Sequence, residues 1–170
     1  MPGSRLPIRD SGICAGRGAG QSFVPQDDGR QAASWIRVAD PRTILIVDDN
    51  DRHLDILAAI LSGVGHDVET CGSGAEALRR MSSRLYEIVV LDLVMPEVGG
   101  VTVAREMRHG GYNQSTPVIV CTANALLAKR QLANVKGIHA IVPKPIDTAA
   151  LVVAVANAPA RQGRTDELRI

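Results

Sequence analysis

The sequence predicts an α/β domain, namely a doubly wound, five-stranded parallel sheet with helices on both faces. Two observations predict it. Short apolar runs alternate along the chain with segments that carry the helical period of about 3.6 residues. The length of 170 residues, with 45% apolar and 22% charged residues, fits one globular domain with tails. Strands that alternate with helices need right-handed crossovers, which make the strands parallel and place helices on both sides.

Five apolar runs are the predicted strands. Four of them are nearly continuous in apolarity and rich in β-branched residues, which is typical of strands buried on both faces. Residues 67–70 alternate polar and apolar side chains instead, as an edge strand does. The five runs are residues 43–47, 67–70, 88–91, 118–121 and 140–142.

Helical patterns fill the segments between these runs. Ser73, three residues before Glu76, predicts a capping box at the start of one helix. The segment 63–65, Gly-Val-Gly, predicts the end of the preceding helix. Residues 149–156 are too few to cross a membrane and predict an amphipathic or buried helix. The apolar faces of the first two helices comprise Leu54, Leu57, Ala58, Leu61 and Val64, and then Ala77, Leu78 and Met81.

The domain is expected to occupy residues 42–160. Residues 1–41 are rich in Gly, Pro, Ser and Arg and show no sustained period, so we expect a flexible N-terminal extension. Residues 161–170 are polar and are expected to form a C-terminal tail.

Composition excludes several classes of function. With 19 basic and 18 acidic residues the net charge is +1, so no direct contact with nucleic acid is expected. Three cysteines without a CxxC pair disfavour a disulfide framework or a zinc site, and they favour a reducing cytoplasm. The sequence contains no apolar run of about 18 residues, so membrane insertion is not expected.

Polar side chains follow four of the predicted strands. Asp48 and Asp49 follow the first strand, Asp92 the third, Thr122 the fourth and Lys144 the fifth. Because parallel strands end at the same edge of a sheet, where ligands bind, we expect these side chains to converge.

A cluster of carboxylates needs a compensating charge. Two carboxylates 4 Å apart repel by about 4 kcal/mol at an effective dielectric constant of 20. A magnesium ion, which prefers oxygen ligands, reverses that sign. The alternative is that Asp48, Asp49 and Asn50 only cap the first helix, and one of them is expected to do so. Capping does not account for Asp92 and Lys144 at the same edge.

Five motifs together resemble the receiver domain of response regulators in bacterial two-component signalling. They are ILIVDDN, SGAEAL, LDLVMPEVGG, VIVCTANA and IVPKP, and the resemblance covers residues 43–158 in the order of that family. It implies the family's flavodoxin-like strand order, 2-1-3-4-5.

The resemblance implies a role for each site residue. Asp92 would be the phosphoacceptor. Asp49, Asp92 and the main-chain carbonyl of Val94 would bind Mg²⁺, with Asp48 acting nearby, through water. Thr122 and Lys144 would contact phosphoryl oxygens.

The resemblance also extends to the backbone and to conformational switching. The Lys144–Pro145 bond would be cis. At the switch position three residues before the lysine, where the family often has Tyr or Phe, this chain has Ile141, so aromatic gating is not expected. Gly99 replaces a commonly acidic residue in the loop after Asp92.

The implied partners are proteins. A histidine kinase or a histidine phosphotransfer protein would donate the phosphoryl group, and an unknown downstream protein would receive the signal. Pairing is common in the family, so the resemblance admits a homodimer. We expect no output domain after residue 160, and no enzyme activity beyond phosphorylation from a phosphodonor and autodephosphorylation.

Two other interpretations stay open. Asp49-Asn50-Asp51 after an apolar strand resembles the start of the haloacid dehalogenase signature of phosphohydrolases, in which Asp49 would be the nucleophile and Asp51 the acid/base. The second alternative is a pseudo-receiver that only binds partners.

The remaining reactive residue types are expected to be structural. Cys71 and Cys121 end two strands and are predicted to be buried. The histidines lack the spacing of metal ligands, so we expect them on the surface or in loops; they are His53, His66, His109 and His139.

Overall fold

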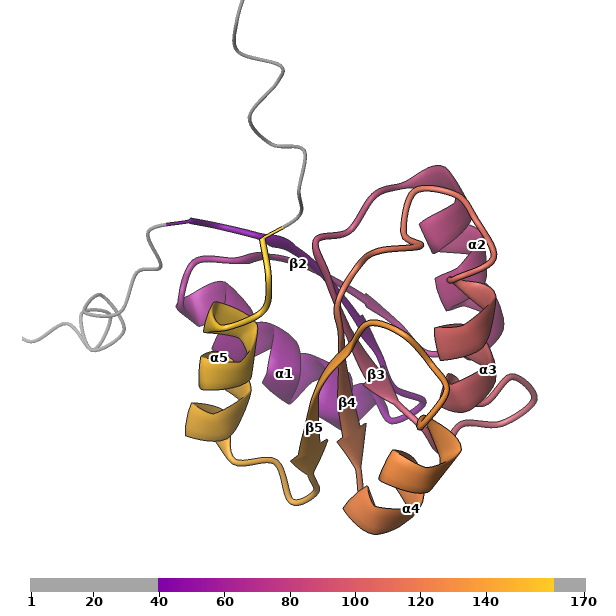
Figure 1. Ribbon diagram of the computed structural model, residues 1–170. Coiled ribbons are helices and arrows are strands. Elements are labelled where there is room, and N and C mark those ends of the chain that lie inside the picture. The colour runs from indigo at the N-terminus through magenta and orange to yellow at the C-terminus, as the bar shows by residue number, and fades with distance from the viewer. Residues whose placement is uncertain (1–39, 161–170) are drawn as a thin grey trace, which may run out of the picture. The chain divides into compact units, whose positions relative to one another are not determined.

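Five strands and five helices alternate along the chain in the computed structural model, which describes residues 40–160 (Figure 1). The predicted C-terminal tail, and all but the last two residues of the predicted N-terminal extension, lie outside the described residues. The elements are β1 (Thr43–Val47), α1 (Asp51–Gly63), β2 (Asp67–Cys71), α2 (Gly74–Ser83), β3 (Ile88–Asp92), α3 (Gly100–Glu106), β4 (Val118–Thr122), α4 (Ala125–Gln131), β5 (Ile138–Pro143) and α5 (Thr148–Ala156).

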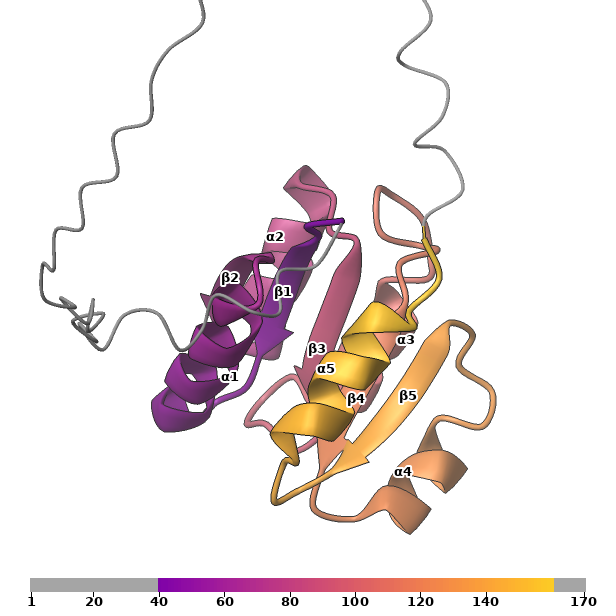
Figure 2. The ribbon, with the colours of Figure 1, turned by 90° about the vertical axis from the view of Figure 1, so that its left-hand side faces the viewer.

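The strands form one parallel sheet in the order β2-β1-β3-β4-β5, as predicted. In the register of β1, Ile46 pairs with Thr70 on one side and with Val90 on the other. Figure 2 shows the strands running side by side behind α1 and α5. Because all five strands run in the same direction, the segments that follow them emerge at one edge of the sheet.

The helices cover both faces of the sheet. Helices α1 and α5 lie on one face, and α2, α3 and α4 lie on the other (Figures 1 and 2). Successive side chains of a strand point to opposite faces, so β1 supplies Ile44 and Ile46 to the first face and Leu45 and Val47 to the second. The helical residues buried against these two faces include Leu54, Leu57, Leu61, Leu151 and Val155 on the first, and Ala77, Met81, Val103, Ala104 and Ala128 on the second.

Helix α1 is capped by Asn50. Its side chain accepts hydrogen bonds from the backbone N–H groups of Arg52, at 3.0 Å, and His53, at 3.3 Å. The helix ends at Gly63, and Gly65 turns the chain into β2 with a φ of 107°. Since Asn50 caps the helix, neither Asp48 nor Asp49 is needed for that purpose.

Helix α2 has Ser73 as its N-cap, as predicted, but forms only half of the predicted capping box. The Ser73 hydroxyl accepts a hydrogen bond from the Glu76 backbone N–H at 3.2 Å. The Glu76 carboxylate accepts a hydrogen bond from the Arg80 side chain, one turn further along the helix. In a complete capping box it would instead accept from the backbone N–H of the N-cap residue.

The fifth strand corrects one prediction. Its apolar run predicted burial on both faces. At the sheet edge, where the predicted order 2-1-3-4-5 places it, β5 is longer than predicted, with Val142 buried and residues 138–141 only half-buried. The apolar residues of β5 are still needed, because helices cover both faces of the sheet at this strand. Ile138 and Ile141 pack on the side of α2, α3 and α4, and Ala140 packs on the side of α1 and α5.

His66 lies in the loop before β2, within the prediction of a surface or loop position, but it is buried rather than exposed. Only 7% of it is exposed, and its Nδ1 accepts a hydrogen bond from the Arg42 backbone N–H at 3.2 Å. Burial, followed by the nearby charge of Arg42, lowers the pKa of His66, with Glu87 acting in the opposite direction. The tight turn at Gly65 places this ring against the start of β1.

The two cysteines at strand ends are buried, as predicted. Burial raises the pKa of Cys71 to about 11 and that of Cys121 to about 12, so both thiols stay protonated at neutral pH. Among residues 40–160, no helix is both long and apolar enough to cross a bilayer.

Candidate functional site

Three carboxylates meet at the edge where the parallel strands end. Asp48 and Asp49 follow β1, and Asp92 is the last residue of the neighbouring strand β3. One oxygen of each lies within 4.8 Å of an oxygen of the other two. Asp48 and Asp92 are buried, while Asp49 is exposed to solvent. The adjacency of β1 and β3 thus joins carboxylates that lie more than 40 residues apart in the sequence.

Lys144 reaches this cluster from the far side of β4. Its Nζ donates to Asp92 Oδ2 at 2.7 Å and to Asp48 Oδ2 at 2.9 Å. Its backbone N–H donates to the Thr122 carbonyl at 2.8 Å, and its bond to Pro145 is cis, as expected. Burial by itself would lower the pKa of Lys144, but the hydrogen bonds with Asp92 and Asp48 outweigh it and raise the pKa above its ordinary value.

Backbone donors orient the two buried carboxylates. Asp48 Oδ1 accepts from the Asn50 N–H at 2.9 Å, and Asp92 Oδ1 accepts from the Val94 N–H at 3.2 Å. The oxygens of the cluster are hard ligands, and three carboxylates outnumber the single ammonium. The donor set and its excess negative charge therefore fit a magnesium ion.

Thr122 ends β4 at the same edge, one residue beyond Cys121, which pairs with Asp92 in the sheet register. It is buried, and its hydroxyl accepts a hydrogen bond from the Asn124 N–H at 3.2 Å. Val94, predicted to lend its carbonyl to the metal, is 73% exposed. Ile141, at the expected switch position, is half-buried.

His53 belongs to the site, a role not predicted from the sequence for this surface residue. It lies in the first turn of α1, and its side chain is 40% exposed. Its Nδ1 lies 3.3 Å from Asp48 Oδ1, 3.2 Å from Asp48 Oδ2 and 3.4 Å from Lys144 Nζ. The available signal was its position three residues after the N-cap Asn50, because side chains of a first turn lean back toward the start of the helix.

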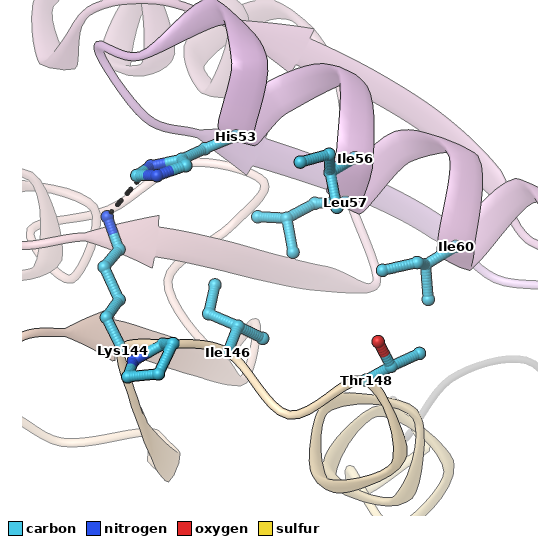
Figure 3. Close-up of a pocket in the computed structure, with 8 residues that line it drawn as sticks. His53, Ile56, Leu57, Ile60, Lys144, Ile146 and Thr148 are labelled. Atoms are coloured by element: carbon cyan, nitrogen blue, oxygen red, sulfur yellow. Dashed lines mark hydrogen bonds between the residues drawn. The ribbon is translucent and has the colours of Figure 1, made fainter.

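An apolar groove of about 200 Å³ adjoins the site. Figure 3 shows α1 on one side and the segment after β5 on the other, with His53 and Lys144 together at one end. Both of these side chains contact Asp48. Ile56, half exposed, is among its walls. The other lining residues are Leu57, Ile60, Pro145, Ile146 and Thr148.

The chain resembles known proteins over the domain described above. It is 29% identical over 109 residues to the signal transduction histidine-protein kinase BarA of Escherichia coli strain K12, covering 64% of this chain and 12% of BarA. It is 32% identical over 118 residues to the transcriptional regulatory protein GlrR of the same strain, covering 69% of this chain and 26% of GlrR. The chain therefore spans only a small part of the length of these two relatives.

A solved structure shares the fold. The receiver domain of the sensor histidine kinase PA1611 from Pseudomonas aeruginosa PAO1, solved with a magnesium ion coordinated in its active site cleft, is 27% identical, with a TM-score of 0.64. The match covers 70% of this chain and 98% of that domain. The family model for the response regulator receiver domain matches residues 44–156. The chain thus belongs to the family of response regulator receiver domains, the phosphoacceptor signalling modules of two-component systems.

Proposed function

We propose that Asp92 accepts a phosphoryl group from a histidine kinase or a histidine phosphotransfer protein, in a reaction that depends on Mg²⁺. The observation that carries this proposal is the contact of Lys144 Nζ with Asp92 Oδ2, at 2.7 Å, inside a cluster of three carboxylates. This contact brings the proposed nucleophile Asp92, the cation Lys144 and the proposed metal ligands together at one edge of the sheet.

Asp49, Asp92 and the Val94 carbonyl would hold the metal ion directly, and Asp48 would hold it through water. When bound, Mg²⁺ neutralises charge that develops on the phosphoryl oxygens. The clustered carboxylates supply hard oxygen ligands for it, and the exposure of Asp49 leaves the cluster open to solvent.

The side chains of the protein supply the rest of the chemistry. Asp92 attacks as a carboxylate, so it needs no base; its oxygen bonds to phosphorus while the bond from phosphorus to the donor histidine nitrogen breaks. The Val94 N–H and the Lys144 ammonium hold the two oxygens of Asp92 beforehand. The lysine then turns to a phosphoryl oxygen, where its charge is needed.

Phosphorylation would change the surface through Thr122. The new oxygens on Asp92 carry up to two negative charges and accept hydrogen bonds. These oxygens attract the Thr122 hydroxyl, which in the unphosphorylated protein accepts a hydrogen bond from the Asn124 N–H. Loss of that hydrogen bond shifts the start of α4. Because Ile141 replaces an aromatic residue, the shift proceeds without rotation of a ring.

The phosphodonor protein is proposed to dock over the groove between α1 and the segment after β5. Ile56 gives the groove an exposed apolar wall, and Lys144 lies at its end, so a partner seated there faces the phosphorylation site. The exposed Leu126 and Leu127 of α4 offer a surface for a downstream protein. The buried, reduced Cys71 and Cys121 support the cytoplasm as the compartment.

The test is phosphorylation of the full chain by radiolabelled acetyl phosphate with Mg²⁺. Label should appear, should need Mg²⁺, and should vanish in Asp92→Asn. Label that persists in Asp92→Asn contradicts the proposal. Continuous release of phosphate from small esters, with Asp49 labelled, supports the haloacid dehalogenase alternative, whereas neither labelling nor Mg²⁺ binding at millimolar concentration supports a pseudo-receiver.

A further inference from the structure

One ring nitrogen of His53 contacts two groups of opposite charge. Its Nδ1 lies 3.2 and 3.3 Å from the oxygens of Asp48, and 3.4 Å from the Lys144 ammonium. The proposed chemistry uses Asp48 and Lys144 and gives His53 no part. Figure 3 shows the imidazole on α1 pointing at the lysine across the end of the groove.

A single nitrogen satisfies only one of these neighbours at a time. With a proton, Nδ1 donates to Asp48; without one, its lone pair accepts from Lys144 and faces the carboxylate oxygens at the same time. A lone pair against a carboxylate is repulsive, and the contacts with Asp48 are the shorter ones. Lys144 already donates to two carboxylates. The geometry therefore favours a proton on Nδ1, shared between both oxygens of Asp48.

We propose that His53 is a positioning residue that holds the Asp48 carboxylate in place when Lys144 turns away from it. This inference rests on the proposed function, in which the lysine moves to a phosphoryl oxygen. Asp48 Oδ2 then loses its ammonium partner, while the Asn50 N–H holds only Oδ1. The imidazole N–H contacts both oxygens, so it keeps the carboxylate from rotating out of the site.

The position of the proton is tested directly by NMR. In the full-length, ¹⁵N-labelled protein, long-range ¹H–¹⁵N correlations show which imidazole nitrogens carry a proton, and the loss of one set of signals in His53→Leu assigns them. A proton on Nδ1 of His53 is the expected result. A proton on Nε2 alone overturns the proposal, whether or not the protein is ever phosphorylated.

Two substitutions separate positioning from packing. In His53→Asn, the amide nitrogen stands at the same distance from Cβ as Nδ1 and keeps a donor, whereas His53→Leu has the same branching without a donor. Loss of a partner that orients a metal ligand costs about tenfold or more in metal affinity or activity, so we expect His53→Leu to lower both by about tenfold, and His53→Asn to restore each to within about threefold of the wild type.

The readouts are Mg²⁺ affinity by calorimetry, and the rate constant and KM for acetyl phosphate. We expect the rate constant to fall and KM to stay unchanged in His53→Leu. Equal losses in both variants, or no loss in His53→Leu, overturn the positioning role. If the wild type binds Mg²⁺ but is not phosphorylated, the proposed function fails, and the calorimetry and the NMR still decide whether His53 positions Asp48.

Discussion

The Lys144 ammonium and the Asp92 carboxylate lie 2.7 Å apart, and each is largely withdrawn from solvent, with side-chain exposures of 18% and 8%. The same ammonium donates to the buried Asp48. One cation therefore compensates two buried anions, and the stability of the site depends on it.

Replacing the lysine should therefore destabilise the protein. In Lys144→Met, Asp48 and Asp92 lose their cation, and removal of one partner of a buried ion pair costs about 3 kcal/mol of unfolding free energy. Urea denaturation in EDTA measures the loss, and added Mg²⁺ should recover part of it. The control is Lys129→Met on the exposed side of α4, where we expect a change within about 0.5 kcal/mol. Equal losses in the two variants contradict the prediction.

Magnesium should stabilise the wild type and not Asp49→Asn. A ligand that binds only the folded state at ten times its Kd adds about 1.4 kcal/mol to the unfolding free energy. Asp49 is exposed, so its amide analogue should fold normally and lose the metal. The measurement is the Tm of each protein with Mg²⁺, compared with its Tm in NaCl at the same ionic strength. A Tm of Asp49→Asn that still rises with Mg²⁺ speaks against the assigned ligand.

Gly100 should not tolerate a side chain. A Cβ at this position would overlap the carbonyl oxygen of Asp92 and lie 2.7 Å from the Leu93 Cα, so α3 packs directly on the backbone of the proposed phosphoacceptor. Gly100→Ala should lower the unfolding free energy by about 1–3 kcal/mol, the usual cost of overpacking, and should slow phosphorylation. The matched control is Gly72→Ala, whose Cβ meets nothing within 4 Å. Similar behaviour of the two variants would sink the prediction.

Stability should depend on pH through His66. Its pKa is lowered in the folded state, so below the unfolded value of about 6.5 the unfolded chain takes up the proton first, and stability falls as the pH falls; above that value the contribution is constant. One proton limits the slope to about 1.4 kcal/mol per pH unit. Chemical denaturation from pH 8 to pH 5 measures it.

The control for this pH dependence is His66→Asn. The amide oxygen stands where Nδ1 is now and can accept from the Arg42 N–H, but it does not titrate in this range. The variant should stay folded and show a flatter stability profile below pH 6.5. An identical profile in the two proteins assigns the pH dependence to other groups.

The sheet and the centre of the site were predictable because both follow from local patterns. Apolar runs predict the strands, and the polar residues after these runs fall at the same edge of the sheet. The sequence alone therefore places Asp92 and Lys144 together. The alternation of residues 67–70 also predicted that β2 is an edge strand, but the apolar pattern of β5 does not mark the other edge. Helices cover both faces of β5, so its residues are apolar although it is an edge strand.

The burial of His66 and the site contact of His53 were both missed, for a related reason. The burial of His66 depends on the turn at Gly65 and on the start of β1, which is distant in sequence. The contact of His53 depends on the direction of its side chain, and this follows only once Asn50 is known to be the cap. Identity and spacing describe a residue, but its neighbours are set by the geometry of the backbone.

Lys144 follows Asp48 by 96 residues, and the two meet only when the last strand has docked. A nascent or truncated chain that stops short of β5 presents an acidic edge without the Lys144 ammonium. The cluster of charges is therefore complete only after β5 has joined the sheet, and loss of chain from the C-terminal side removes the buried Leu151 and Val155 of α5 before it reaches Lys144.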